Sequence, residues 1–221
     1  MGTDDIFKKR RAKRTRDLAR RKARRGPYAK VLIVCEGEKT EPNYFREMIA
    51  HYKISSANVV ITGDCGASPI HVVEFAIQRY RSEKNTGDPF DKIFCVFDKD
   101  THSSYSQALD ILRRAKPKNT FFAITSVPCF EYWLLLHYGY TTRPYEDVYG
   151  RSTAHQVISD LKKQMPTYEK KQKGIFLALF SKLESAKKYA AQGLKHAAQS
   201  GTDNPSTRVH ELVDFLQNIK K

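Results

Sequence analysis

The sequence lacks closely spaced cysteines. Its four cysteines, Cys35, Cys65, Cys95 and Cys129, are separated by at least 30 positions, and no C-x-x-C pair occurs. This spacing excludes the usual zinc fingers and zinc ribbons, because those sites need ligands at short, regular intervals. Cys35 and Cys95 stand within apolar runs, where a free cysteine is buried as a small hydrophobic residue. Unpaired cysteines of this kind fit a reducing cytoplasm, which we expect for this chain.

Long hydrophobic runs are also missing. No stretch approaches the roughly 18 apolar residues that a membrane-spanning helix needs, and the most apolar segment, FEYWLLLHY, is short and contains an acid. The first 26 residues contain no apolar segment of the kind that a secretory signal requires. The chain has 221 residues, of which 40% are hydrophobic, enough to bury a core. We therefore expect a globular protein without a membrane partner.

Acidic residues are scarce relative to basic ones. The chain has 39 Lys and Arg against 24 Asp and Glu, a formal net charge of +15 at pH 7. Residues 1–26 alone hold 12 of those cations against 3 acids, so most of the excess belongs to an N-terminal arm. Such an excess favours a polyanionic partner, and nucleic acid is the leading class. The arm itself is either a solvated, disordered tail or a helical or flexible segment that neutralises phosphates, with targeting as a third role.

Strand and helix patterns alternate after the arm. Apolar runs predict strands over 29–36, 58–63, 91–100 and 120–126. Amphipathic or buried segments between and after them predict helices over 41–54, 68–84, 103–116 and 128–140. Because the strands are apolar along their whole length, this alternation predicts a mainly parallel sheet with helices on both faces.

The pattern changes near residue 141. A loop leads into three further predicted helices over 153–165, 181–199 and 206–220, and Ser206 or Thr207 caps the last of them. The predicted layout is a basic arm, an α/β core and a helical C-terminal part packed on that core, over 1–26, 27–140 and 141–221 respectively.

Acidic residues follow two of the predicted strands. Glu36 ends the first strand, and Asp98-Lys99-Asp100 ends the third. The carboxyl ends of parallel strands share one edge of the sheet, where ligands collect. Carboxylates gathered there repel one another unless a cation neutralises them, and hard oxygen ligands suit Mg²⁺ or Mn²⁺. We therefore predict that Glu36, Asp98 and Asp100 bind the metal, and that Gly37, which has no Cβ, leaves room for a phosphate.

Lys99 lies between the two aspartates of the D-x-D pair. If its side chain points inward, this cation holds a phosphate or weakens metal binding. Strand alternation favours the outward direction.

Glu38, Lys39 and Glu41 follow the first strand where the next helix begins. Acids are favoured at a helix N-terminus, which explains Glu38 and Glu41 without a ligand. The functional alternative makes Glu38 a second carboxylate at the metal and Lys39 a phosphate contact.

Glu131 interrupts an aromatic segment, between Phe130 and Tyr132. An acid in these surroundings is hard to bury without a partner. It follows the fourth predicted strand, so it is either catalytic or metal-associated at the same edge, or a structural ion pair or helix-dipole contact. Arg208 and His210 begin the last predicted helix and are candidates for contacts to a substrate phosphate.

Four segments, LIVCEGEKTEPNYF, VFDKD, PCFEYWLLLHY and NPSTRVHELV, together resemble the RloB-like family, which is linked to restriction loci and abortive phage resistance. The resemblance spans about residues 28–220. That family is related to the Toprim domains of topoisomerases, primases and OLD-type nucleases, so the resemblance implies a Toprim-like α/β fold. In Toprim proteins the first-strand glutamate is a general acid/base in phosphodiester chemistry and the later D-x-D binds Mg²⁺. Those roles fall on Glu36, and on Asp98 and Asp100. The resemblance also implies an ABC-type ATPase partner from the same locus.

These observations lead to two functional hypotheses. The first is a Mg²⁺- or Mn²⁺-dependent Toprim-type nuclease that cleaves RNA or DNA in anti-phage defence, with Glu36, Asp98, Asp100 and Glu131 in catalysis. In this hypothesis Gly37, Lys39, Arg208 and His210 contact the substrate phosphates. The second is a non-catalytic Toprim-like module that binds nucleic acid or the ATPase. Convergence of the acids at an open edge favours the enzyme.

Overall fold

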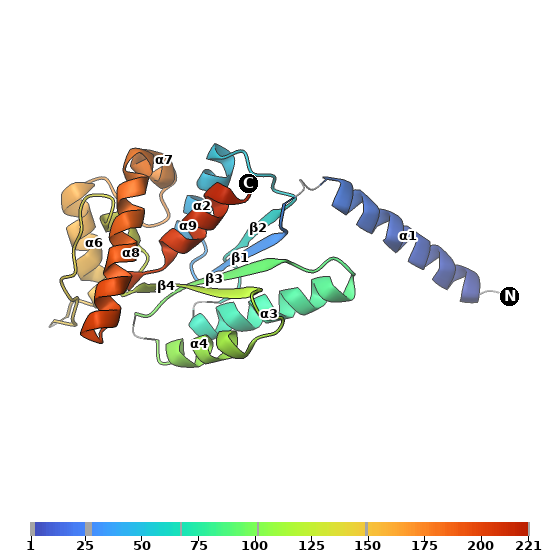
Figure 1. The fold of residues 1–221 in the computed structure, drawn as a ribbon, viewed down its shortest axis with the longest axis horizontal. Coiled ribbons are helices and arrows are strands. Elements are labelled where there is room, and N and C mark those ends of the chain that lie inside the picture. Colours follow the sequence, from blue (N-terminus) through green and yellow to red (C-terminus); the bar gives the residue numbers. More distant parts are fainter. Residues whose placement is uncertain (1–2, 25–27, 67, 101, 149, 221) are drawn as a thin grey trace.

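A five-stranded sheet forms the centre of the protein (Figure 1). The computed structural model describes residues 3–24, 28–66, 68–100, 102–148 and 150–220. The strand order is β2-β1-β3-β4-β5. Their bounds are Val31–Cys35 for β1, Val59–Thr62 for β2, Lys92–Asp98 for β3, Phe121–Val127 for β4 and Ser206–Thr207 for β5. Strands β1 to β4 are parallel, and β5 is antiparallel to β4. The predicted α/β class with a mainly parallel sheet is confirmed.

Helices cover both faces of this sheet, as predicted, and Figure 1 shows α3 and α4 on one side with α2 and α9 on the other. The helices are α1 (Thr3–Arg24), α2 (Thr40–His51), α3 (Pro69–Asn85), α4 (Tyr105–Arg114), α5 (Glu131–Leu135), α6 (Thr153–Gln164), α7 (Ile175–Leu179), α8 (Leu183–Ser200) and α9 (Val209–Asn218), with a 3-10 turn, η1, over Phe180–Lys182. The predicted helical character of the C-terminal part is confirmed.

The two-sided burial of the sheet is clearest in β1. All five of its residues are fully buried. Val31, Ile33 and Cys35 belong to the hydrophobic core that includes α2 and the C-terminal helices, whereas Leu32 and Val34 belong to the core that includes α3 and α4. Because successive side chains of a strand point to opposite faces, a continuously apolar run is what a central strand covered on both sides requires.

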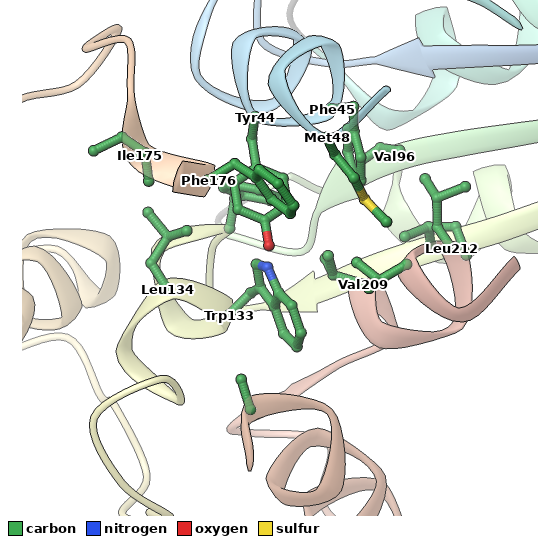
Figure 2. Close-up of a cluster of buried hydrophobic side chains, with 14 of the residues drawn as sticks. Tyr44, Phe45, Met48, Val96, Trp133, Leu134, Ile175, Phe176, Val209 and Leu212 are labelled. Atoms are coloured by element: carbon green, nitrogen blue, oxygen red, sulfur yellow. The ribbon is translucent and has the colours of Figure 1, made fainter. Parts of the chain in front are cut away.

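The larger of the two cores joins the α/β part to the C-terminal helices. Figure 2 shows Trp133 of α5 among side chains from α2, α7 and α9, including Tyr44, Phe176 and Leu212. Trp133 and Phe176 have no exposed surface. Tyr44 makes edge-to-face contacts with Phe130 and Phe176, at centroid distances of 5.6 and 5.4 Å. The helices after residue 141 are therefore packed into the core that supports β1.

Two predicted helices differ most from their predicted extents. The helix predicted over 128–140 is the short α5, because Leu136 to Tyr138 continue only as turns. The helix predicted from residue 206 begins at Val209, because Ser206 and Thr207 pair with β4. Arg208 is therefore the N-cap residue, and neither Ser206 nor Thr207 occupies that position. Helix α7 was not predicted.

The N-terminal arm contains α1, a helix of 22 residues. Figure 1 shows it extending away from the sheet and its covering helices. Its described side chains from Ile6 to Lys13 are exposed. Over the described residues 3–24 the arm is helical, and its binding role stays a prediction. Within the described ranges, no helix combines the length and apolar character needed to cross a membrane.

Candidate functional site

A cleft of about 410 Å³ opens at the carboxyl end of β1 and β3. Four buried or partly buried carboxylates meet there, from the end of β1, the first turn of α2, the end of β3 and the start of α5. The lining residues are Glu36, Gly37, Glu38, Lys39, Thr40, Glu41, Asp98, Phe130, Glu131, Lys170 and Lys171. The parallel topology explains this gathering, because it places the ends of adjacent strands at one edge.

Two contacts to its carboxylate hold Glu36 at the edge of the sheet where the cleft opens. The backbone N–H of Asp98 donates to Oε2 at 3.0 Å, and Nε2 of His102 lies 3.0 Å from Oε1. The side chain of Glu36 is 11% exposed, and that of His102 is 33% exposed. Burial raises the pKa of Glu36, while the Asp98 N–H and His102 oppose the rise.

Asp98 is the last residue of β3, and its carboxylate points into the cleft. The backbone N–H of Phe130 donates to Oδ2 at 3.1 Å. Burial raises the pKa of Asp98 well above its ordinary value, and the charges of Glu41, Glu131 and Glu36 raise it further. The predicted approach of Glu36 and Asp98 is therefore present in the structure, and their charges repel each other.

Glu41 lies in the first turn of α2, where acids are favoured, and its side chain is also buried in the cleft. Burial raises its pKa from 4.5 to about 7, with further increases from Glu131 and Glu36. A Cβ on Gly37 would overlap the Glu41 carboxylate, so the glycine lets this acid lie against the turn. The helix-start interpretation of Glu41 is correct but incomplete.

Glu131 is the first residue of α5 and is 3% exposed. The hydroxyl of Tyr168 donates to its Oε1 at 3.0 Å, and Nζ of Lys170 lies 3.8 Å from the same oxygen. Glu131 thus has a cationic partner and also lines the acidic cleft, and the choice between its two predicted roles stays open.

Lysines from a distant loop complete the cleft. Lys170 and Lys171 precede α7 and line the cleft together with Lys39. The loop is tied to α2 because the N–H of Lys171 donates to Thr40 Oγ1 at 3.2 Å and the N–H of Phe176 donates to Glu47 Oε2 at 3.0 Å. Burial lowers the pKa of Lys170, but the charges of Glu131, Cys129, Asp98 and Glu41 together outweigh burial and leave this pKa raised.

Asp100 and Lys99 lie near this cleft but outside its lining. Asp100 has a φ of 27°, and its N–H donates to the Pro128 carbonyl at 3.1 Å. Its charge contributes to the raised pKa of Glu36, so the two acids are electrostatically coupled. Lys99 points away from the four carboxylates, because its Nζ contacts both carboxylate oxygens of Asp203 at 2.8 and 2.9 Å.

Arg208 and His210 do not line the cleft either. Nη1 of Arg208 contacts Oε1 of Glu211 at 2.7 Å, and its backbone N–H donates to Thr125. His210 is 8% exposed, and burial lowers its pKa. Its Nδ1 has no hydrogen-bond partner among the residues that the structure describes. The phosphate contacts predicted for these two residues stay predictions.

The donor set of the cleft suits a hard divalent cation. Carboxylate oxygens are the ligands that Mg²⁺ and Mn²⁺ prefer, and the like charges that raise the pKa of Asp98 and Glu41 are those that a cation relieves. Within the described ranges, no three His, Cys, Asp or Glu side chains are already arranged around one metal position. Mg²⁺ often binds through one or two carboxylates, water and substrate phosphate, so a closed cage of side chains is not required.

Three functional candidates were not found from the sequence. His102 follows the D-x-D pair, and its position next to the acids was the available signal. Lys170 and Lys171 carried no local signal, because their place depends on a loop anchored to α2 more than 120 residues earlier in the chain.

Comparison with protein families supports the resemblance seen in the four sequence segments. The family model described as RloB-like protein matches residues 31–216, which include every residue of the cleft. Comparisons with curated proteins and with solved structures give no match. Because the matched span covers the sheet, the cleft and nearly all of the C-terminal helices, the chain belongs to the RloB-like family.

Proposed function

We propose that this chain is a divalent-metal-dependent nuclease that hydrolyses phosphodiester bonds in RNA or DNA. The observation that supports the proposal most directly is the meeting of Glu36, Glu41, Asp98 and Glu131 in one open cleft. Burying four like charges near one another is costly unless a cation or protons compensate them. A structural role alone gives no reason to collect them at the sheet edge where ligands bind.

In this proposal Glu36 and Asp98 hold Mg²⁺ or Mn²⁺, with Asp100 close by, and Glu41 and Glu131 complete the negative surroundings. A bound metal would lower the pKa of a water molecule and offset negative charge on the scissile phosphate. Glu131 is the less direct participant, because Tyr168 and Lys170 already occupy one of its oxygens.

The protein's own residues have distinct tasks in the proposed reaction. Glu36 holds or releases a proton at its carboxylate, and its raised pKa brings the protonated form closer to neutral pH. The partly exposed His102 at 3.0 Å connects that carboxylate with solvent. Lys39, Lys170 and Lys171 attract the phosphate backbone to the cleft. Gly37 keeps the turn open for Glu41 and for an approaching phosphate.

The biological setting is proposed from the family resemblance and from charge. We infer that the nuclease acts in anti-phage defence, in the cytoplasm, and that an ABC-type ATPase encoded at the same locus regulates it. The net charge of +15 and the basic helix α1 support a nucleic-acid substrate.

A second function, a non-catalytic module that binds nucleic acid or the ATPase, is favoured by one observation. Both oxygens of Glu36 are engaged, by the Asp98 N–H and by His102. In the described residues, side chains would have to turn before three of them met at one metal position. In such a module the acids of the cleft are a recognition surface, and no bond is cleaved.

Two substitutions separate these functions. Glu36→Gln and Asp98→Asn each remove one charge while keeping the side-chain shape. We expect each to lower cleavage of mixed RNA and DNA in Mg²⁺ or Mn²⁺ by on the order of 100-fold or more. The assay is run with and without the ATPase, which is proposed to license activity.

Glu74→Gln is the matched control, because Glu74 is exposed on α3 outside the cleft. Thermal unfolding checks that all three variants fold. Cleavage that persists unchanged in both cleft variants contradicts the nuclease mechanism, and wild-type protein that binds nucleic acid but never cleaves it supports the binding module.

A further inference from the structure

A basic groove runs along α6, well separated in sequence from the acidic cleft. Two hollows of about 680 and 250 Å³ lie side by side there, because Arg143, Asp160 and Lys163 line both of them. We call this continuous surface the α6 groove. Arg151 and Lys162 lie in the larger hollow, whose lining includes His155 but no Phe, Tyr or Trp. The smaller hollow includes three tyrosines, Tyr138, Tyr140 and Tyr145.

The charge of the α6 groove is strongly positive. Among its lining residues in the described chain, Asp160 is the sole acid, and it faces Arg143 at 3.1 Å and Lys163 at 2.7 Å. Asp160 thus fixes two cations in place and neutralises one of them. Arg151 and Lys162 are exposed, and within the described ranges no salt bridge involves either side chain. These two cations are available to a polyanion.

The smaller hollow adds aromatic surface to this charge. Tyr138 and Tyr140 are partly exposed. The ring of Tyr140 lies 5.8 Å from that of Tyr189, and Nζ of Lys182 lies 3.9 Å above the ring of Tyr138. Proteins that bind single-stranded nucleic acid combine a positive groove along the backbone with aromatic rings on which bases stack. A duplex does not offer unstacked bases to such rings.

Helix α5 connects the α6 groove with the acidic cleft. Glu131 at its first residue lines the cleft, and Leu135 at its last residue lines the tyrosine-bearing hollow. Five helical residues rise by only about 6 to 8 Å. The aromatic end of the groove therefore begins about one and a half helical turns from the cleft, with the buried helix α5 between them.

We propose that the α6 groove binds single-stranded nucleic acid, with Arg151 and Lys162 on the phosphates and Tyr140 stacked against a base. The inference deepens the proposed function, since it names the form of nucleic acid delivered to the cleft. Its binding step does not depend on cleavage, so it is tested without a metal.

The first test measures the affinity of the full chain for short fluorescent oligo(U) and oligo(dT) strands in EDTA over a range of salt concentrations. Arg151→Gln with Lys162→Gln is expected to reduce the slope of log affinity against log salt by about 1.4, because each single-strand phosphate contact contributes about 0.7. The matched control is Arg81→Gln with Lys84→Gln, an exposed arginine and lysine on α3 that line a different hollow. Equal slopes in the two double variants overturn the proposal, because binding would then reflect net charge alone.

The second test examines stacking. Tyr140→Leu keeps an apolar side chain of similar bulk and removes the aromatic face. We expect single-strand affinity to fall roughly 5- to 150-fold, while affinity for a duplex of the same length changes little. A wild-type protein that binds the duplex at least as tightly as the strand, together with no effect of Tyr140→Leu, contradicts the proposed single-strand groove.

The same variants separate this inference from the nuclease proposal. Asp98→Asn is expected to lose cleavage, whereas Arg151→Gln with Lys162→Gln is expected to lose strand affinity in EDTA. If the groove variants bind strands normally and the wild type cleaves them, the groove proposal is refuted and the nuclease proposal stands. If the groove variants lose strand binding and the wild type never cleaves, the groove proposal stands and the nuclease proposal is refuted.

Discussion

The crowding of carboxylates in the cleft makes a quantitative prediction about Glu41. Its pKa rises from 4.5 to about 7 on folding, chiefly through burial. Each pKa unit corresponds to about 1.36 kcal/mol, so the folded state loses about 3 kcal/mol of stability as Glu41 ionises. The sign follows from proton binding. Between pH 4.5 and 7 the folded chain holds a proton at Glu41 that the unfolded chain has released, so the contribution is present at low pH and is lost as pH rises through 7.

The assay is urea unfolding between pH 5 and pH 8 without divalent metal. The Glu41→Gln variant removes the ionisable group and keeps the hydrogen-bonding shape, so between pH 5 and pH 8 its free energy of unfolding should fall by about 2.5 kcal/mol less than that of the wild type. A residual fall is expected, because the raised pKa values of Asp98 and Glu36 act in the same direction. Glu74→Gln on the surface of α3 should follow the wild-type curve.

Addition of Mg²⁺ extends the same experiment. A cation that binds the folded cleft and not the unfolded chain should restore stability at pH 8, where the carboxylates are charged, and should do so less at pH 5. Parallel pH curves for the wild type and Glu41→Gln would refute the assignment of this pH dependence to Glu41. Equal effects of Mg²⁺ on the wild type and Asp98→Asn would refute metal binding at the cleft.

Two further predictions concern the residues at the two ends of β1. Lys30→Met removes a buried cation whose Nζ lies 2.8 Å from Glu83 and 3.1 Å from Asp88. We expect the free energy of unfolding in urea to fall by about 3 to 5 kcal/mol. A fall below about 1 kcal/mol would show that stability does not depend on these ion pairs. Gly37→Ala places a Cβ against the Glu41 carboxylate and should cost about 1 to 3 kcal/mol, whereas Gly139→Ala, where no atom lies close to the added Cβ, is the control. Equal unfolding free energies for the two alanine variants would contradict the close packing of the turn.

The sheet was predictable because its signals are local. The run Val31–Cys35 has no polar residue, and only a strand covered on both faces buries such a run completely. Strand β5 was not predictable in this way. Its two residues are polar, and they form a strand only because β4 offers an edge to which Ser206 and Thr207 pair. Helix α7 has five residues, too few for an amphipathic pattern to repeat.

The residues of the candidate site likewise divide into those with a local sequence signal and those without one. Glu36 and Asp98 were identifiable because each ends a recognisable strand, and parallel strands end at a common edge. Glu41 was assigned to the helix start, which is true, but its burial depends on the turn at Gly37 and on Glu131 from another part of the chain. Lys170 reaches the cleft through a loop held by side chains of α2. Contacts between segments distant in sequence have no local signature.

The distribution of charge links the cleft to its surroundings. The protein is strongly basic overall, yet its candidate reaction site is lined by five carboxylates, four of them buried or partly buried, with three lysines among them. The basic helix and the α6 groove attract a polyanion over a Debye length of about 8 Å and keep it near the surface. The acids at the centre repel a phosphate that arrives without a cation. On the proposed function, the same charges that recruit a divalent metal therefore exclude the substrate from the cleft until the metal is present, so strand binding and cleavage have separate ionic requirements.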